Sequence, residues 1–299
     1  MAEITASLVK QLREKTGAGM MECKSALVEA NGDLEEAEVV LRKRGLASAA
    51  KKSARSAKQG LIGVHISPDG RTGVLVEVNC ESDFVARTEE FQQMVAAMAA
   101  LIAAAKPADI AGLMATPTAE GPTVEEALKS KIAKIGENMV IPRFALHPAK
   151  GVLGSYVHPG AQLAVLVDVT SSDPAAAGKP EFAELLHDIA MQVAAADPKF
   201  ISKEEVTAEY LEKEKDIQRA RALAEGKPEK IVDKVVEGRM AKYYEEVCLL
   251  EQPFIKENSI TIAQLLAEKG KALGATLGIA GYVRFKVGET TAAEEAAAE

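Results

Sequence analysis

The sequence aligns with itself without a gap when it is shifted by 91 residues, the separation of Ile62 and Leu153. At this offset Val74-Leu-Val-Glu-Val78 coincides with Val165-Leu-Val-Asp-Val169, and Glu90-Phe91 coincides with Glu181-Phe182. Such self-similarity indicates a duplicated structural unit whose two copies pack against each other. The chain is therefore expected to contain two similar halves.

Each copy has the pattern of two strands followed by a helix. Runs rich in β-branched residues predict the strands, and apolar residues at helical spacing, such as Phe91 and Val95, predict the helix. Units of this kind build an α+β core, in which sheets and helices form separate layers. The first copy is predicted to have strands at 61–66 and 73–79 and a helix ending at Ala105, and the second copy strands at 152–157 and 163–170 and a helix at 181–196.

The two copies differ most in the loop between the second strand and the helix. The first copy has Ser82-Asp83-Phe84-Val85, whereas the second has Asp173-Pro174-Ala175-Ala176. Positions that both copies share are expected to be architectural, and positions that differ are candidates for function. Phe84 is thus either a binding residue on a strand-to-helix loop or a hydrophobic staple that packs on the following helix. His158 also distinguishes the copies, although a histidine in a turn commonly faces solvent without a role.

Residues 1–46 are predicted to form a small partner-binding module of three short helices, at 4–15, 20–30 and 34–44. Gly17-Ala-Gly19 and Asn31-Gly32 separate these helices, and Asp33 is a suitable cap for the third. Met20 and Met21 open the second helix, and one of them is expected to fill the small core because both cannot face inward. Residues 47–60 follow as a basic linker with a partly helical, solvated character.

The remaining chain divides into a core N-subdomain at 61–148 and a core C-subdomain at 149–288. Between the copies the sequence predicts a helix at 123–134, ended by Gly136, and a strand at 139–146. A charged helical hairpin at 204–245 is broken at Gly226-Lys-Pro228 and has a narrow apolar seam, so it is expected to project from the core. A helix at 261–273, a strand at 278–287 and an acidic, disordered tail at 289–299 complete the chain. The seam is predicted to consist of Leu211, Ile217 and Leu223 facing Ile231, Val235 and Met240.

Composition excludes several functional classes. The formal net charge of -8 argues against a protein that binds nucleic acid directly, because such domains usually carry excess positive charge. The three cysteines are widely spaced and odd in number, which favours reduced thiols and a cytoplasmic location. No apolar run is long enough to span a membrane, and the opening Met1-Ala-Glu-Ile-Thr lacks the basic region and apolar core of a signal sequence, so neither export nor membrane insertion is expected.

The sequence also lacks the motifs of covalent catalysis. It contains no phosphate-binding GxxxxGK[ST] loop, no HExxH and no GxSxG, and its four histidines stand far apart without metal-ligand spacing. A metal site, a cofactor and an enzymatic active site are therefore not expected.

Five ordered blocks of the chain resemble the family of bacterial elongation factor Ts. They are the opening Ala2-Glu-Ile-Thr to Met21, Glu77-Val-Asn-Cys-Glu-Ser-Asp-Phe-Val-Ala86, Lys134-Ile-Gly-Glu-Asn138, Gly154-Ser-Tyr-Val-His158 and Val236-Glu-Gly-Arg-Met240. The resemblance implies a guanine-nucleotide exchange factor for elongation factor Tu, which itself binds the GDP and magnesium. It also implies a ubiquitin-associated-like N-terminal module and a hairpin that forms a homodimer through a coiled coil.

The resemblance assigns roles to particular positions. Ser82-Asp83-Phe84-Val85 matches the motif that in the family displaces the partner's magnesium ion, with Ser82 in place of a threonine. Ile135, Gly136 and His158 match residues that touch the partner's nucleotide-binding domain. Met20, Met21 and Lys24 match the contact face of the N-terminal module.

Two other classes of function remain open. The chain could be a chaperone-like adaptor that uses its small module and hairpin for binding without any effect on a nucleotide. It could also be an enzyme with a site between the two copies, although the missing catalytic motifs disfavour that interpretation.

Overall fold

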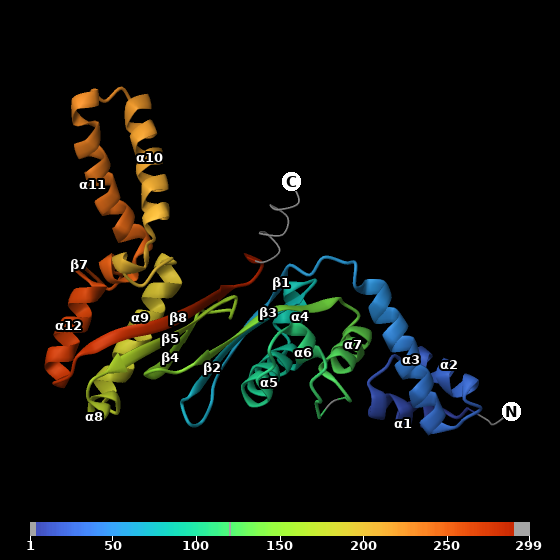
Figure 1. Cartoon of the computed structure of the whole chain (residues 1–299). Coiled ribbons are helices and arrows are strands. Elements are labelled where there is room, and N and C mark those ends of the chain that lie inside the picture. Colours follow the sequence, from blue (N-terminus) through green and yellow to red (C-terminus); the bar gives the residue numbers. More distant parts are fainter. Residues whose placement is uncertain (1–3, 120, 290–299) are drawn as a thin grey trace.

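The structure is a computed structural model that describes residues 4–119 and 121–289. Helices and antiparallel sheets form an elongated molecule (Figure 1), so the predicted α+β class is confirmed. Most of the predicted acidic tail, from residue 290 onward, lies outside the described residues.

The first sheet has the order β1-β2-β3, with β1 (Gln59–Ile66), β2 (Thr72–Cys80) and β3 (Met139–Pro148). Both faces of its central strand are buried. Val74, Val76 and Val78 project to one face and pack with helix α5 (Glu89–Ala105), while Leu75 projects to the other face. Helices α6 (Ile110–Met114) and α7 (Val124–Ile135) complete this half.

The second sheet repeats this arrangement with the order β4-β5-β8. Its strands are β4 (Val152–Val157), β5 (Leu163–Ser171) and β8 (Leu277–Lys286), and helices α9 (Pro180–Ala196) and α12 (Ile262–Leu273) cover one face. Helix α9 has the bounds of α5 displaced by 91 residues, which confirms the duplication seen in the sequence. In both halves the third strand comes from outside the repeated segment.

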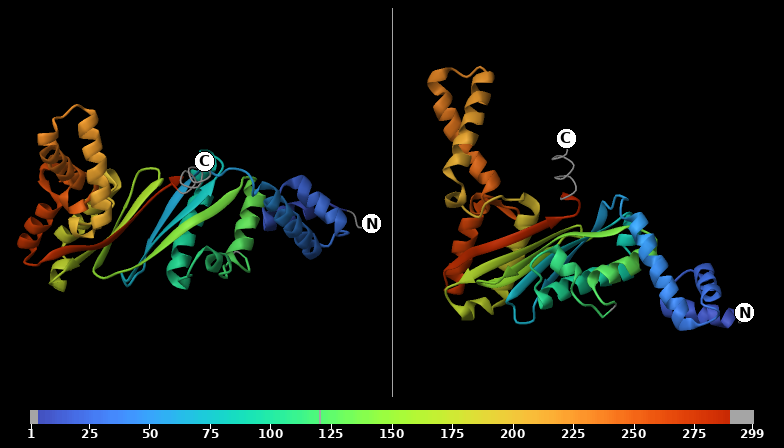
Figure 2. Two further views of the ribbon diagram at one scale, coloured as in Figure 1. Left: turned by 45° about the horizontal axis from the view of Figure 1, so that its top comes forward. Right: turned by 45° about the vertical axis from the view of Figure 1, so that its right-hand side comes forward.

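The two sheets contact each other through the faces that their helices do not cover. Leu75 of the first sheet packs there with Leu166 of the second, together with Ile62, Ala164 and Phe285. A Cβ atom at Gly73 would lie 3.0 Å from Leu166 Cδ1, so a larger side chain would require the Leu166 side chain to shift. The duplicated halves thus share a common apolar interface. The strands of the two sheets lie next to each other in the middle of the molecule (Figure 2).

A buried carboxylate lies at the same repeat position in each central strand. Glu77 accepts hydrogen bonds from Arg143 Nε at 2.8 Å and from Gly288 N–H at 2.8 Å. Asp168 accepts bonds from the N–H groups of Lys150 at 2.7 Å and Gly151 at 2.8 Å, and its Oδ2 lies 3.1 Å from His147 Nε2. Both carboxylates are fully buried beside an irregularity in strand register. Glu77 thereby binds the segment after β8, and Asp168 approaches His147 of β3, so each carboxylate contacts a residue of the other half.

The N-terminal helices are α1 (Ala6–Thr16), α2 (Met20–Glu29) and α3 (Leu34–Lys52), packed around a small core. The predicted end of the third helix at Arg44 is wrong, because α3 continues to Lys52. The additional turns are rich in alanine, a strong helix former, and Ala49 is buried against the core of the first half. The connection from these helices to β1 is therefore helical over its first part.

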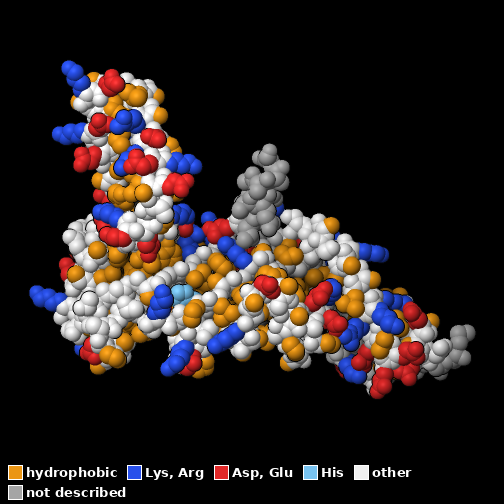
Figure 3. Space-filling model, in the orientation of Figure 1, with side chains coloured by type: hydrophobic (Ala, Val, Ile, Leu, Met, Phe, Trp, Pro, Cys, Tyr) orange, Lys and Arg blue, Asp and Glu red, His pale blue; other side chains and the backbone are white. Residues whose placement is uncertain are grey.

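Helices α10 (Ala208–Ala224) and α11 (Glu229–Val247) form an antiparallel pair that projects from the second half (Figure 1). The first was predicted to start at Glu204, but Thr207 caps it and the helix starts at Ala208. Lysines, arginines and acidic residues are interspersed over the surface of this helical pair (Figure 3). The remaining short elements are α4 (Asp83–Ala86), α8 (Pro174–Ala177), η1 (Lys203–Glu205), η2 (Leu249–Glu251), β6 (Pro253–Phe254) and β7 (Glu257–Thr261).

Candidate functional site

Phe84 lies on the one-turn helix α4, directly after the central strand of the first sheet. Ser82 caps this helix by accepting a hydrogen bond from Val85 N–H at 3.3 Å, and Val85 packs against the core. The Phe84 side chain is 81% exposed. The loop prediction is therefore corrected to a helical turn, and the staple interpretation is wrong because the ring does not pack on α5.

The second copy retains the turn without the aromatic side chain. Helix α8 occupies the equivalent residues, and Asp173 caps it through Ala175 N–H at 2.9 Å. Ala175 stands where Phe84 stands in the first copy. The one-turn helix is thus part of the duplicated architecture, whereas the aromatic ring belongs to the first copy alone.

The side chain of Glu137 joins α4 to the corner that contains Ile135 and Gly136. Glu137 accepts hydrogen bonds from Ser82 N–H at 2.9 Å and from the Ser82 hydroxyl at 2.5 Å. Gly136 ends α7 with a φ of 91°, and it is exposed, whereas Ile135 is half-buried against the core. The structure therefore brings the 82–85 and 135–136 segments together.

His158 lies in the exposed turn between β4 and β5, and its Nδ1 is 3.0 Å from the Tyr156 hydroxyl. This turn reaches the first half, because Ile62 N–H donates a hydrogen bond to the carbonyl of Ala161 at 2.7 Å. A shallow hollow of about 540 Å³ separates the turn from α4 and α5, with His158 on one side and Arg87 on the other. The second copy thus contributes His158 to the surface that carries α4.

Met20, Met21 and Lys24 lie on α2, in the N-terminal helices. The prediction that one methionine fills the core is wrong, because Met20 is 56% and Met21 is 74% exposed. Cys23, Ala26 and Leu27 occupy the core positions of α2 instead. The methionines, Lys24 and exposed Val28 form a partly apolar helix face.

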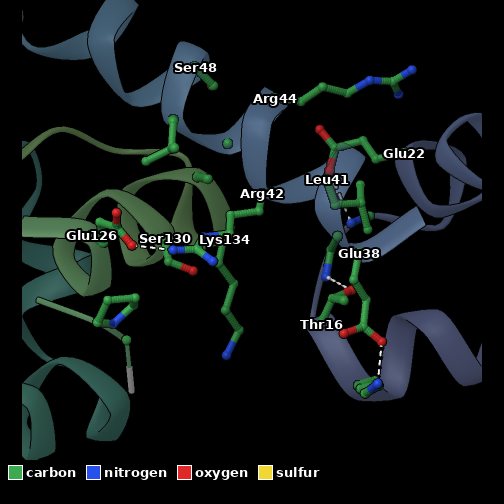
Figure 4. Close-up of a pocket in the computed structure, with 18 residues that line it drawn as sticks. Thr16, Glu22, Glu38, Leu41, Arg42, Arg44, Ser48, Glu126, Ser130 and Lys134 are labelled. Carbon is green, nitrogen blue, oxygen red and sulfur yellow. Dashed lines mark hydrogen bonds and ion pairs between the residues drawn. The ribbon is translucent and has the colours of Figure 1, made fainter. Parts of the chain in front are cut away.

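A cleft of about 450 Å³ lies between the N-terminal helices and α7 (Figure 4). Arg42 of α3 and Glu126 of α7 form an ion pair across it. The Lys134 side chain lies against Gly17, where a Cβ atom would be 2.8 Å from Lys134 Cε. The α1–α2 connection therefore faces the end of α7, next to Ile135 and Gly136.

Comparison with known proteins identifies the family of this chain. The family profile described as elongation factor Ts matches residues 81–289. A protein of Clostridium perfringens named Elongation factor Ts is 48% identical over 96% of this chain and 93% of its own length. The chain belongs to the elongation factor Ts family. Proteins of the same name from Solibacter usitatus and Nitratidesulfovibrio vulgaris are 48% and 43% identical, over 97% and 98% of this chain and 93% and 99% of their own. Membership identifies a factor of translation elongation in protein biosynthesis.

The charged groups around α4 and the end of α7 form ion pairs with one another. Asp83 pairs with Arg87 at 2.9 Å, and Glu90 binds Lys134 at 2.7 Å, which lowers the pKa of the Glu90 carboxyl. Within 4–119 and 121–289 no group of three or more metal-ligating side chains is suited to hold an ion. None of the helices in these same ranges has the length and apolar character needed to cross a bilayer.

Sequence reasoning did not assign a role to Glu137 or Arg87, although both lie beside the predicted site residues. Glu137 falls within the Lys134-Ile-Gly-Glu-Asn138 block that resembles elongation factor Ts, so its presence in that block was the available signal. Its contact with Ser82 joins residues 55 positions apart, and no local pattern predicts such a pair.

Proposed function

We propose that this chain is a guanine-nucleotide exchange factor that binds elongation factor Tu with GDP and promotes GDP release. The observation that supports this proposal is Phe84, a large aromatic side chain that is held outside the core on a capped helical turn. Exposed aromatic side chains on rigid elements commonly anchor protein interfaces. In this proposal Ser82, Asp83, Phe84 and Val85 form the element that displaces the partner's magnesium ion.

Two further sets of residues would bind the same partner. Ile135, Gly136 and His158 would contact its nucleotide-binding domain, since they lie on segments joined to α4 or facing it across the hollow. Met20, Met21 and Lys24 would form a separate contact through the exposed face of α2.

The mechanism is thermodynamic linkage and involves no covalent chemistry. A factor that binds nucleotide-free elongation factor Tu more tightly than the GDP form must weaken GDP binding by the same factor. Phe84 inserted beside the magnesium site would favour a conformation with poor phosphate and metal coordination. GDP and magnesium belong to the partner, so the chain needs no cofactor of its own.

The other parts of the chain receive proposed roles from the family. Residues 1–46 would be a ubiquitin-associated-like binding module, 47–60 its connection, and 61–148 and 149–288 the two subdomains of the core. The α10–α11 hairpin would form a homodimer through a coiled coil, and Ile217 and Leu223 are exposed on it. The proposed location is the cytoplasm.

The substitution Phe84→Ala tests the proposal. Loss of an interface anchor commonly costs about 2 kcal/mol, so GDP release stimulated by the variant should be roughly thirtyfold slower. Because the ring is exposed, the melting temperature should stay within a few degrees of the parent. Stopped-flow measurement of fluorescent GDP leaving elongation factor Tu gives the rate.

Ile255→Ala provides a matched control, since Ile255 is also an exposed apolar residue but lies in the second half, after β6. This variant should stimulate release normally. Unchanged GDP release with folded Phe84→Ala would refute the magnesium-displacement role. A complex with elongation factor Tu that forms equally well with and without GDP would instead support an adaptor.

A further inference from the structure

Two carboxylates continue the pairing of β2 and β3 beyond the end of the strands. The backbone ladder ends at the pair Cys80 and Met139. At the next positions Glu81 accepts a hydrogen bond from Asn138 N–H at 2.6 Å, and Glu137 accepts the two bonds from Ser82. Each segment thus supplies a carboxylate that binds the backbone of the other. We call this arrangement the carboxylate clamp.

We propose that Glu137 is a positioning residue for nucleotide exchange, because its carboxylate fixes the start of α4 and thereby the direction of Phe84. The proposal rests on the exchange function proposed above. Glu137 is half-buried, whereas Phe84 is exposed, so the two side chains have separable roles. Phe84 touches the partner, and Glu137 holds the element that carries Phe84.

A single helical turn requires such support. One turn is too short to be stable alone, because few hydrogen bonds compensate for the ordered backbone. Ser82 caps α4 and is itself held by Glu137 through bonds to a charged acceptor, which are stronger than bonds between neutral groups. An aromatic side chain that is already oriented loses less conformational entropy when it binds. The clamp therefore favours productive contact by Phe84.

The second copy supplies an internal comparison. Its ladder between β5 and β8 ends at Ser171 and Leu277, and the following pair joins Ser172 and Thr276 by two bonds of 2.9 Å. The position that corresponds in register to Glu137 is Ala275. The fold thus closes this corner with alanine in the copy that lacks the aromatic residue, and has the carboxylate in the copy that carries Phe84.

The substitution Glu137→Ala tests the proposal when it is combined with Phe84→Ala. The single variant should stimulate GDP release from elongation factor Tu about fivefold less than the parent, and the double variant should match Phe84→Ala within about twofold. Glu137→Gln should stimulate GDP release nearly as well as the parent, because the glutamine amide can accept a hydrogen bond from Ser82 N–H and donate one to the Ser82 hydroxyl. Ser172→Ala removes the side-chain bond at the equivalent corner and should leave release unchanged.

Hydrogen exchange in the free protein tests the clamp without the partner. Glu137→Ala should accelerate exchange of the Ser82 and Val85 amides by about tenfold or more while the amides of α9 keep their rates. A normal rate of GDP release with Glu137→Ala would overturn the positioning role. So would a double variant whose rate of GDP release is reduced by the product of the two single effects. If Phe84→Ala itself has no effect on release, the exchange function fails, and unaltered amide exchange in Glu137→Ala would then reject the clamp as well.

Discussion

Phe84 and Ala175 occupy equivalent places in the two copies, and they differ in what they expose to solvent. The Phe84 ring lies outside the core, so it contributes little apolar burial to folding. Ala175 is also exposed, and the turn that carries it has the same bounds at the repeat offset. An aromatic residue at this position is thus unnecessary for the fold, which is why a role in binding explains it best.

The buried cysteines permit a prediction about pH. Burial raises the pKa of the Cys80 thiol from 9.0 to about 12 and that of Cys248 from 9.0 to about 11. The native state therefore retains protons that the unfolded state loses above pH 9, so stability should fall as pH rises from about 9 towards 12. Thermal melting between pH 8 and pH 10.5 measures this loss.

Thiol titration provides the corresponding check at pH 8. All three cysteines are buried, so the native protein should react slowly with a disulfide reagent, and protein in guanidinium chloride should react at once. Rapid reaction of a native thiol would contradict the buried environment of these residues.

At the scale of elements, the end of α7 shows how a single backbone conformation shapes the site. Gly136 has a φ of 91°, and no atom lies within 4 Å of the place where a Cβ would stand. Gly136→Ala should therefore lower stability by about 1 kcal/mol through backbone strain alone. Chemical denaturation of the variant measures the change.

Gly238→Ala is the matched control, because Gly238 lies in the interior of α11 and is equally free of neighbouring atoms. Alanine is favoured over glycine in a helix by about 1 kcal/mol, so this variant should be stabilised. Equal destabilisation of both variants would contradict the argument from backbone conformation.

The projecting hairpin illustrates the limit of helical periodicity. Its buried seam consists of Ala222, Val232, Val236 and Met240, with Leu211, Val235 and Tyr243 partly buried, whereas Ile217, Leu223 and Ile231 are exposed. The prediction is thus correct for Leu211, Val235 and Met240 and wrong for the other three. In an adjacent apolar pair such as Ile231-Val232, either residue fits the helical spacing of a seam. Only the contact between the two helices decides which of them faces the partner helix.

At the scale of the whole molecule, Glu77 and Asp168 link the two halves at equivalent positions. Glu77→Gln would remove the buried charge that accepts hydrogen bonds from Arg143 Nε and from Gly288 N–H, and loss of a hydrogen bond to a charged group costs about 2 kcal/mol. The variant should therefore melt at a clearly lower temperature, which calorimetry can measure.

Glu14→Gln removes an exposed partner of Lys10 and should change stability by less than about 1 kcal/mol. A Glu77→Gln variant that melts like the parent would show that the linkage between the halves does not depend on this charge.

Patterns in the chain were sufficient to predict the duplication, the α+β class, the helix caps at Asp33 and Gly136, and Phe84 as the residue that distinguishes the two loops. These features depend on local propensity and on comparison between copies, which a linear chain displays directly. Contacts formed on folding settled that both Met20 and Met21 are exposed, that Ala49 of α3 is buried against the first half, and that Glu137 binds Ser82. Those outcomes depend on which surfaces meet after folding, and residues far apart in the chain carry no local signal of their contact.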